Sequence, residues 1–269
     1  MYKEYQPHEI LVPYIDKYWV MEGTMEPEAR IKILPDGCTD FIFNLDETAN
    51  LLDRDGMRVG GMQAYFVGPM RVYSELQICS AVVHTVGVRF TPCGLTIFTR
   101  IPMSEFTDRR VFLPDLNVLF PVDFAGMLKE KKTLKERLAL IDRYLLSCLR
   151  YSGDVDKQVA WAAGVIHQSD GKMPVRELME QVCLCQRHFE RRFKNATGYT
   201  PKEYTRIVKF RRTVDALRRV TRENLFSVAV DCGYYDQSHL VKEFRRLSGS
   251  LPSVFASLPE GVPITYLDG

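Results

Sequence analysis

The sequence predicts an α+β protein of two domains, with a small β-barrel or sandwich first and an all-helical part last. Three observations predict this class. Short runs rich in β-branched and aromatic residues, separated by Gly and Pro, fill the first half of the 269-residue chain. After residue 155, apolar residues recur at helical spacing almost without interruption. Charge divides the chain as well, because 172–250 carries 17 Lys and Arg against 9 Asp and Glu, whereas 1–153 carries 18 against 20.

The composition excludes several protein classes. Apolar residues make up 46% and charged residues 26%, as in ordinary globular proteins. No uninterrupted apolar window is long enough to span a bilayer, and the N-terminus lacks a signal pattern, so we expect a cytoplasmic protein. The seven cysteines are scattered and odd in number, which predicts reduced thiols and no disulfide framework.

The strands of the first half follow one another between turn signals. Segment 30–45 holds two apolar runs around a Pro-Asp-Gly turn, in which Pro35 presets φ and Gly37 accepts positive φ. Further strand-like runs lie at 41–45, 65–67, 72–78 and 81–90. Several short strands at this spacing are typical of a small barrel or sandwich. The run 94–99 is predicted to be a short helix.

A long amphipathic helix is predicted over 133–149. Its apolar stripe consists of Leu134, Leu138, Ile141, Leu145 and Leu149, at spacings of 4, 3, 4 and 4 residues. Two interpretations remain open: the stripe packs onto its own domain, or it forms a dimer seam. The stripe is too short to establish a coiled coil. Residues 151–154 combine Ser and Gly and are predicted to form a hinge.

Helices dominate the remainder of the chain. The predicted segments are 155–168, 175–181, 185–195, 201–219, 226–231 and 236–247. Asp154 is the expected N-cap of the first helix, and Pro201 suits a first helical position. Gly249 and Pro252 are expected to close the helical part.

The second half contains two copies of one unit, 51 residues apart over most of their length. Each copy runs through a short helix, a tight turn, a longer helix, a Gly and a Pro. The matching segments are 178–183 with 228–233, 185–193 with 236–244, Gly198 with Gly249, and Pro201 with Pro252. This order predicts two helix-turn-helix units.

The longer helix of each unit has one apolar and one polar face. Phe189 and Phe193, or Leu240 and Phe244, lie four apart and are expected to face the core. Gln and Arg side chains pair with base edges, and Lys and Arg bind phosphates. The polar faces therefore predict DNA-binding residues: Gln186, Arg187, Glu190, Arg191 and Lys194 in the first unit, and Gln237, Ser238, His239, Lys242, Arg245 and Arg246 in the second.

The helix between the units has a length that suits DNA. Segment 201–219 holds 19 residues, or about 28 Å at 1.5 Å per residue. One turn of B-DNA is about 34 Å. A strut of this length is expected to hold two recognition helices in successive major grooves.

These residues resemble the AraC/XylS family of bacterial transcription regulators over about 175–255. The second unit, SVAVDCGYYDQSHLVKEFRRLSGSLPSVF, carries the strongest resemblance. The first unit departs from the family at Met179, Cys183 and Cys185, and Thr213 replaces a usual Ala. The missing Ser-type cap at Cys185 is expected to weaken the first recognition helix by roughly 0.5–2 kcal/mol.

The resemblance implies a role for each of the polar residues. Base-reading positions are Arg187, Glu190 and Arg191 in the first unit, and Gln237, Ser238, His239 and Lys242 in the second. Phosphate contacts fall to Lys194, Arg245 and Arg246. His188 is assigned to surface or structure, and Tyr234 to packing.

The first half resembles, less specifically, the β-rich domain that precedes such DNA-binding pairs. The resemblance depends on LPDGCTDFIFNL, FVGPM and GVRFTPCGL. It implies a cupin-like sandwich with flanking helices and a sensor or dimerisation role. The expected organisation is a β-rich regulatory domain at 1–125, a connecting helix at 126–153 and a DNA-binding domain at 154–257.

The first half also offers candidates for an effector pocket. Aromatic residues for an apolar lining are Trp19, Tyr65, Tyr73, Phe41 and Phe90, and polar residues that would orient a ligand are Asp36, Asp40 and Arg89. Core packing explains the aromatic residues equally well. Arg89 stands between Val88 and Phe90, so its side chain is expected on the opposite face of a strand from theirs.

Catalysis and metal binding have little support in the sequence. A metal-dependent cupin enzyme needs several converging His residues, and the β-rich half has only His8 and His84. Cys183 and Cys185 lack a second pair, so a metal or redox site there is disfavoured. We therefore expect no enzyme, no cofactor, double-stranded DNA as partner, a small-molecule effector and a homodimer. The alternatives are a ligand sensor whose helical half is a protein-interaction module, and a single-stranded RNA binder.

Overall fold

The computed structural model describes most of the chain. The described residues are 1–24, 30–46, 50–53, 58–61, 63–79, 82–116, 118–149, 154–182, 184–219 and 225–255. The predicted hinge at 151–154 lies outside them except for Asp154, and Cys183 also lies outside them. No helix within the described ranges is long and apolar enough to cross a membrane.

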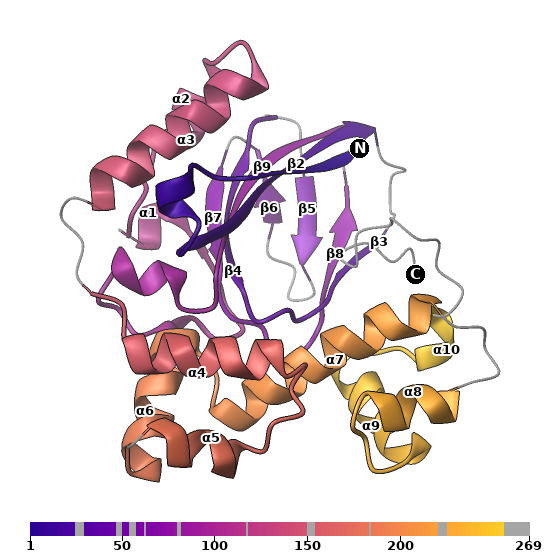
Figure 1. Cartoon of the computed structure of the whole chain (residues 1–269). Coiled ribbons are helices and arrows are strands. Elements are labelled where there is room, and N and C mark those ends of the chain that lie inside the picture. Colours follow the sequence, from indigo (N-terminus) through magenta and orange to yellow (C-terminus); the bar gives the residue numbers. More distant parts are fainter. Residues whose placement is uncertain are drawn as a thin grey trace.

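The first half forms two antiparallel sheets packed face to face (Figure 1). The six-stranded sheet has the order β1-β2-β9-β4-β7-β10, and the four-stranded sheet has the order β3-β8-β5-β6. Their bounds are β1 Tyr2–Tyr5, β2 Ile15–Thr24, β3 Arg30–Ile33, β4 Thr39–Asn44, β5 Asn50–Asp53, β6 Arg58–Gly60, β7 Ala64–Val67, β8 Ser74–Ile78, β9 Val82–Phe90 and β10 Arg110–Phe112. The predicted sandwich is confirmed. A closed barrel is not formed, because no strand pairing among the described residues joins the two sheets.

The six-stranded sheet is buried on both faces. On β4, Phe41 and Phe43 face one core, while Ile42 faces a second core between the two sheets. Trp19 and Tyr65 belong to the second core. The expectation that Phe41 and Phe90 line one cavity with Trp19 and Tyr65 is therefore wrong, because the side chains of a strand alternate between faces.

Five short helices and the longer helix α3 cover the Phe41 face of this sheet. They are η1 Glu9–Leu11, η2 Gly94–Ile97, η3 Met103–Phe106, α1 Leu113–Leu116, α2 Phe124–Lys129 and α3 Leu134–Leu149. The stripe of α3 buries Ile141 and Leu145 completely in this core, and Leu134, Leu138 and Leu149 pack against it. Of the two interpretations of the stripe, the structure therefore shows packing onto its own domain.

The second half is helical, as predicted. Its helices are α4 Lys157–Gln168, α5 Val175–Val182, α6 Gln186–Thr197, α7 Pro201–Arg219, α8 Leu225–Asp231, α9 Gln237–Ser248 and α10 Pro252–Phe255. The N-cap of α4 is Asp156, which accepts a hydrogen bond from the amide of Val159, so the expectation of Asp154 is wrong. No helix was predicted at the position of α10, where Pro252 was expected to close the helical part.

Two separate cores hold the helical half together. One lies among α4, α5, α6 and the start of α7, and the other among the end of α7, α8, α9 and α10. Figure 1 shows the two groups at opposite ends of α7, beneath the strands. Each core also contains one residue of the β-rich half: Cys93 in the first and Leu34 in the second.

Candidate nucleic-acid interface

The internal repeat extends to individual hydrogen bonds. The longer helix of each unit, α6 or α9, is its recognition helix. Gly198 follows α6 and Gly249 follows α9. Both glycines have the left-handed backbone conformation, with φ of 80° and 69°, and cap the carbonyl groups of their helix. One residue earlier, the hydroxyls of Thr197 and Ser248 each bond the carbonyl four residues back and the amide two residues on. The two units therefore end their recognition helices in the same way.

The two recognition helices begin differently. In α9, Asp236 accepts a hydrogen bond of 2.7 Å from the amide of His239. In α6, Cys185 has the extended conformation of an N-cap but makes no side-chain bond. The predicted weakness of the first unit's cap thus has a structural basis in one missing hydrogen bond.

The apolar faces of both helices are buried as predicted. Phe189, Phe193, Leu240 and Phe244 are each 0% exposed. In the first unit, Phe193 packs against Tyr204 with ring centroids 5.7 Å apart. These four side chains fix the rotation of each helix, so the opposite face points outward.

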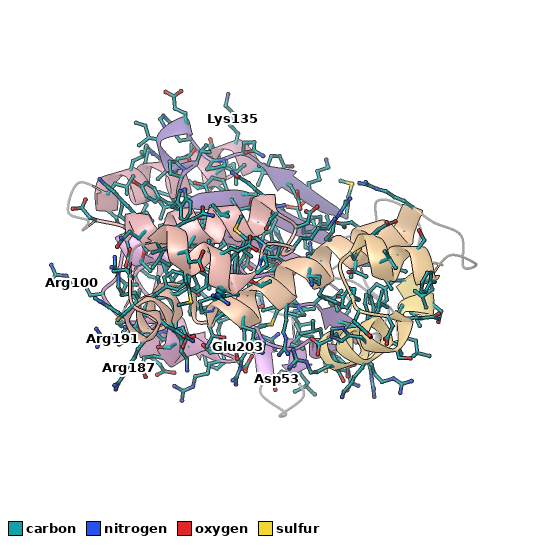
Figure 2. All side chains as sticks on the ribbon, turned by 60° about the horizontal axis from the view of Figure 1, so that its bottom comes forward. Asp53, Arg100, Lys135, Arg187, Arg191 and Glu203 are labelled. Carbon is teal, nitrogen blue, oxygen red and sulfur yellow. The ribbon has the colours of Figure 1, made fainter. Side chains whose placement is uncertain are left out.

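On α6, the predicted DNA-binding residues lie on the outer face. Gln186, Arg187, Arg191 and Lys194 are exposed, and Glu190 is half-buried. Figure 2 shows Arg187 and Arg191 projecting side by side from the surface. The amide of Gln186 donates to Glu190 at 2.9 Å, so these two residues are already paired with each other.

On α9, all six predicted residues are exposed. They are Gln237, Ser238, His239, Lys242, Arg245 and Arg246. Together with Val241, five of them line a shallow, open hollow on the outer face of α9: Gln237, Ser238, Lys242, Arg245 and Arg246. Three of these five side chains are positively charged, so this face is basic, as phosphate binding requires.

Two acidic residues, Glu243 and Asp156, hold three basic side chains in place, and sequence reasoning missed both acidic residues. Glu243 lies 3.3 Å from Arg246 and 3.6 Å from Arg206 of α7. Asp156 forms a two-point ion pair with Arg192 of α6, with both N···O distances at 2.7 Å. The second pair ties the start of α4 to the first recognition helix. A carboxylate near an Arg on an adjacent helix is visible in the sequence only once the packing is known.

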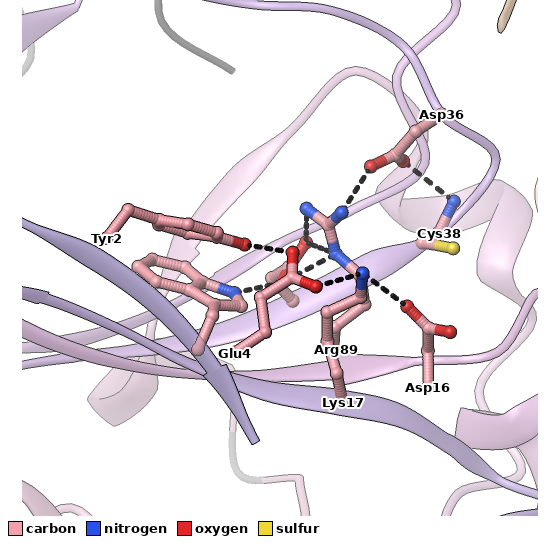
Figure 3. A network of polar contacts seen from close by, with 9 residues as sticks. Tyr2, Glu4, Asp16, Lys17, Asp36, Cys38 and Arg89 are labelled. Carbon is pink, nitrogen blue, oxygen red and sulfur yellow. Dashed lines mark hydrogen bonds and ion pairs between the residues drawn. The ribbon is translucent and has the colours of Figure 1, made fainter. Parts of the chain in front are cut away.

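The polar ligand candidates of the β-rich half lie together but are occupied by one another (Figure 3). Arg89 lies 2.9 Å from Asp36 and 3.1 Å from Asp40. Trp19 donates its indole N–H to Asp40 at 2.7 Å. As expected, Arg89 faces away from Val88 and Phe90, which are in the other core.

Burial and charge act in opposite directions on these two carboxyls. Burial raises the pKa of Asp40 above its ordinary value, and Arg89 offsets only part of this effect. Burial also raises the pKa of Asp36, but the charges of Arg89 and of Arg211 on α7, with the hydrogen bond from the amide of Cys38, together outweigh it and the pKa falls below its ordinary value. The charge of Arg211 in the helical half thus acts on a carboxyl of the sandwich.

The two tyrosines among the ligand candidates are separated. Tyr65 is buried between the sheets, near Trp19 in the same core. Tyr73 packs instead against the core of the second helix-turn-helix unit. No group of metal-ligating side chains occurs in the described parts of the chain, and Cys185 is exposed.

Two family profiles match the chain. Residues 178–257 match a helix-turn-helix domain, which is of the AraC type, and residues 3–112 match a domain of unknown function (DUF6597). No curated protein matches the sequence.

Solved structures share the fold. ToxT from Vibrio cholerae aligns with a TM-score of 0.54 at 8% identity, covering 91% of this chain and 99% of that chain. ToxT from Vibrio cholerae O395 bound to (E)-4-(8-methylnaphthalen-1-yl)but-3-enoic acid aligns with a TM-score of 0.51 at 10% identity, covering 89% and 98%. Both the β-rich half and the helical half therefore occur in the same order in a known two-domain fold.

Proposed function

We propose that this chain, a DNA-binding transcription regulator with an AraC-type helix-turn-helix domain, reads two adjacent major grooves with α6 and α9. The observation that carries the proposal is the repeated geometry of the two recognition helices. Each has a buried apolar face, an exposed polar face and the same left-handed glycine at its end. The 19-residue helix α7 joins the units, at about 28 Å end to end.

The exposed residues divide by the chemistry of their side chains. Arg187, Arg191 and Lys242 carry donors that match guanine edges, and Gln237 matches adenine. Ser238 and His239 complete the base-reading face of α9. Because Glu190 accepts hydrogen bonds, it suits the amino group of cytosine once Gln186 releases it.

The remaining basic residues are proposed to bind phosphates. Lys194, Arg245 and Arg246 lie toward the ends of α6 and α9 and are exposed. Phosphate contacts fix the register of a helix in the groove but do not read sequence. Arg246 is already held by Glu243, which orients its guanidinium before DNA arrives.

The β-rich half is proposed to be the regulatory domain, at 1–125, with 126–153 connecting it to the DNA-binding domain at 154–257. Its ligand is proposed to be a small molecule, and the organic acid bound by ToxT supplies one class to test. Trp19 and Tyr65 are the proposed apolar contacts. Asp36, Asp40 and Arg89 can contact a ligand only after their ion pairs open. Tyr73 is proposed to transmit a change to α9 and not to contact the ligand, because it packs against the core that contains α9.

Two further expectations stay proposals. A homodimer would have to form through a surface other than the stripe of α3, which its own domain covers. A cytoplasmic location is consistent with a regulator of DNA. The family and fold are those of transcription regulators, which are not enzymes.

Selection from a random duplex pool tests the function. The full chain is expected to enrich two short boxes about 10 base pairs apart. Arg191→Ala and Lys242→Ala are each expected to relax one box and to cost about 1–3 kcal/mol of binding. Arg176→Ala is the matched control, because Arg176 is exposed on α5, outside both recognition helices.

Each outcome of the selection decides between functions. No enrichment by the full chain refutes the proposal and favours a protein-interaction module. Enrichment of single-stranded RNA from a parallel pool would favour the RNA alternative, which requires exposed aromatic residues beside the basic ones. A change of affinity on adding the organic acid, or on removing residues 1–150, supports regulation by the β-rich half.

A further inference from the structure

Three sequence motifs of the β-rich half contact the DNA-binding half. Gly37 of LPDGCTDFIFNL lies against the ring of Tyr204 on α7, where a Cβ would overlap it. Cys93 of GVRFTPCGL is buried in the core of the first helix-turn-helix unit. The third motif, FVGPM, leads into Pro69–Tyr73, the segment that contacts both units. We call this segment the brace.

The brace holds the end of the first recognition helix. The hydroxyl of Tyr199 donates to the carbonyl of Met70 at 3.0 Å. Pro69 packs against Gly198 so closely that a Cβ on the glycine would overlap its ring. From the loop beside the brace, the hydroxyl of Thr107 donates to the carbonyl of Gly198 at 2.9 Å.

The brace also holds the end of the second recognition helix. The backbone amide of Tyr73 donates to the carbonyl of Leu247 at 2.9 Å. The ring of Tyr73 lies on Gly249, again without room for a Cβ. Lys32 stands 5.0 Å from the centroid of that ring and donates to the hydroxyl of Ser250 at 2.9 Å.

The two contact points are equivalent in the internal repeat. Gly198 and Gly249 occupy the same cap position, 51 residues apart. Five residues reach at most about 18 Å when extended, so one short segment joins the ends of both recognition helices. Asp108 stiffens the brace, because it bonds both the amide and the guanidinium of Arg71, at 2.7 Å and 2.6 Å.

We propose that the brace fixes the distance between the two recognition helices and thereby selects the spacing of the two DNA boxes that the protein accepts. This inference depends on the proposed DNA-binding function. Because α7 contributes to two separate cores, no core among the described residues spans both units and limits their relative tilt. The brace removes this freedom, since it grips both units at the point where each recognition helix ends. Thr107 and Tyr73 are thus positioning residues that touch no DNA.

The test compares box spacing among variants of the full chain. Thr107→Val removes the hydroxyl that bonds Gly198, whereas Thr107→Ser keeps a hydroxyl and is the matched control. Tyr73→Ala removes the ring from Gly249. The probes are the random duplex pool, then duplexes with the two selected boxes at varied separation, and a duplex with a single box.

The wild-type chain and Thr107→Ser are expected to prefer one spacing. The preference is the ratio of the affinity at the favoured spacing to the affinity at spacings one or two base pairs away. In Thr107→Val and Tyr73→Ala this ratio is expected to fall about two- to tenfold, since one hydrogen bond or one ring contact is removed. Their affinity for the single-box duplex is expected to equal that of the wild type. That combination supports the brace, because a merely structural role would weaken binding to all duplexes alike.

Two results would overturn the inference: a spacing preference that is unchanged in both variants, or an affinity that falls equally at every spacing and for the single box. If a variant fails to fold, Tyr199→Phe, which removes only the hydroxyl bonded to Met70, replaces it and must broaden the preference. Absence of two boxes with the wild-type chain refutes the proposed reading of DNA by two helices, and is thereby distinguished from failure of the brace.

Discussion

Replacing Cys185 by Ser is predicted to stabilise the first recognition helix. The backbone of Cys185 already has the extended conformation of an N-cap, with φ −67° and ψ 147°, so Ser fits without rearrangement. Its hydroxyl gains the bond to a first-turn amide that Asp236 makes in the second unit. A Ser, Thr, Asp or Asn cap contributes about 0.5–2 kcal/mol over a residue that does not cap. The midpoint of that range corresponds to roughly an eightfold change in an opening equilibrium.

Amide hydrogen exchange within α6 measures this change directly. Exchange through local opening should slow about two- to thirtyfold in Cys185→Ser, and Cys185→Ala should stay near the wild type. Asp236→Ala, the converse substitution, should speed exchange in α9 by a similar factor. Equal exchange in the Ser and Ala variants at position 185 would refute the reasoning, because the two differ at this site only in the capping hydroxyl.

Three further predictions follow from single contacts. Burial raises the pKa of Asp156, but the hydrogen bonds and charge of Arg192, together with the amides of Val159 and Gln158, outweigh it and hold the pKa below its ordinary value. The resulting stabilisation is complete above about pH 4 and is lost as the pH falls through the lowered value. Asp156→Asn should therefore flatten the acid limb of a plot of unfolding midpoint against pH, and an unchanged limb would contradict this. Gly87→Val should displace the indole of Trp19, which lies directly on Gly87. The substitution should lower the free energy of unfolding by about 1–3 kcal/mol and shift tryptophan emission to the red, and unaltered emission would count against this packing. Lys194→Ala should reduce the slope of log affinity against log salt by about one, and an unchanged slope would exclude its phosphate contact.

The sequence predicted local structure well where one pattern decided it. Helix α7 begins at Pro201 and ends at Arg219 as expected, because a proline start and a long amphipathic stripe define it. The repeat predicted both recognition helices and their buried phenylalanines. It also predicted the weaker cap at Cys185, which the structure confirms by the missing side-chain bond.

Patterns that depend on a partner were harder to predict. Strand β2 was missed because its central residues, 18–20, are all buried, so the expected alternation disappears. Asp154 and Asp156 offer the same cap chemistry, and only the fold chooses between them. Barrel and sandwich share the same strand composition, since closure depends on which strands pair.

The contacts that matter most for function span the longest stretches of chain. Tyr199 and Met70 are 129 residues apart, and Lys32 and Ser250 are 218 apart. No spacing rule predicts such pairs. The motifs LPDGC, FVGPM and GVRFTPCGL were a usable signal, because each contains a residue that the structure places against the helical half. For Arg89, periodicity predicted only that its side chain lies on the opposite face of the strand from Val88 and Phe90. Its ion pairs were not predicted, because periodicity does not say which residues occupy the opposing layer.

Methylation interference on a selected duplex tests the central claim most directly, because methyl groups at guanine N7 block contacts in the major groove. Two recognition helices in adjacent grooves predict two clusters of interference about 10 base pairs apart on one face of the DNA. Arg191→Ala should remove the cluster that belongs to α6, and Lys242→Ala the one that belongs to α9. A single cluster unaffected by either substitution, or no interference at all, would contradict reading of DNA by two helices.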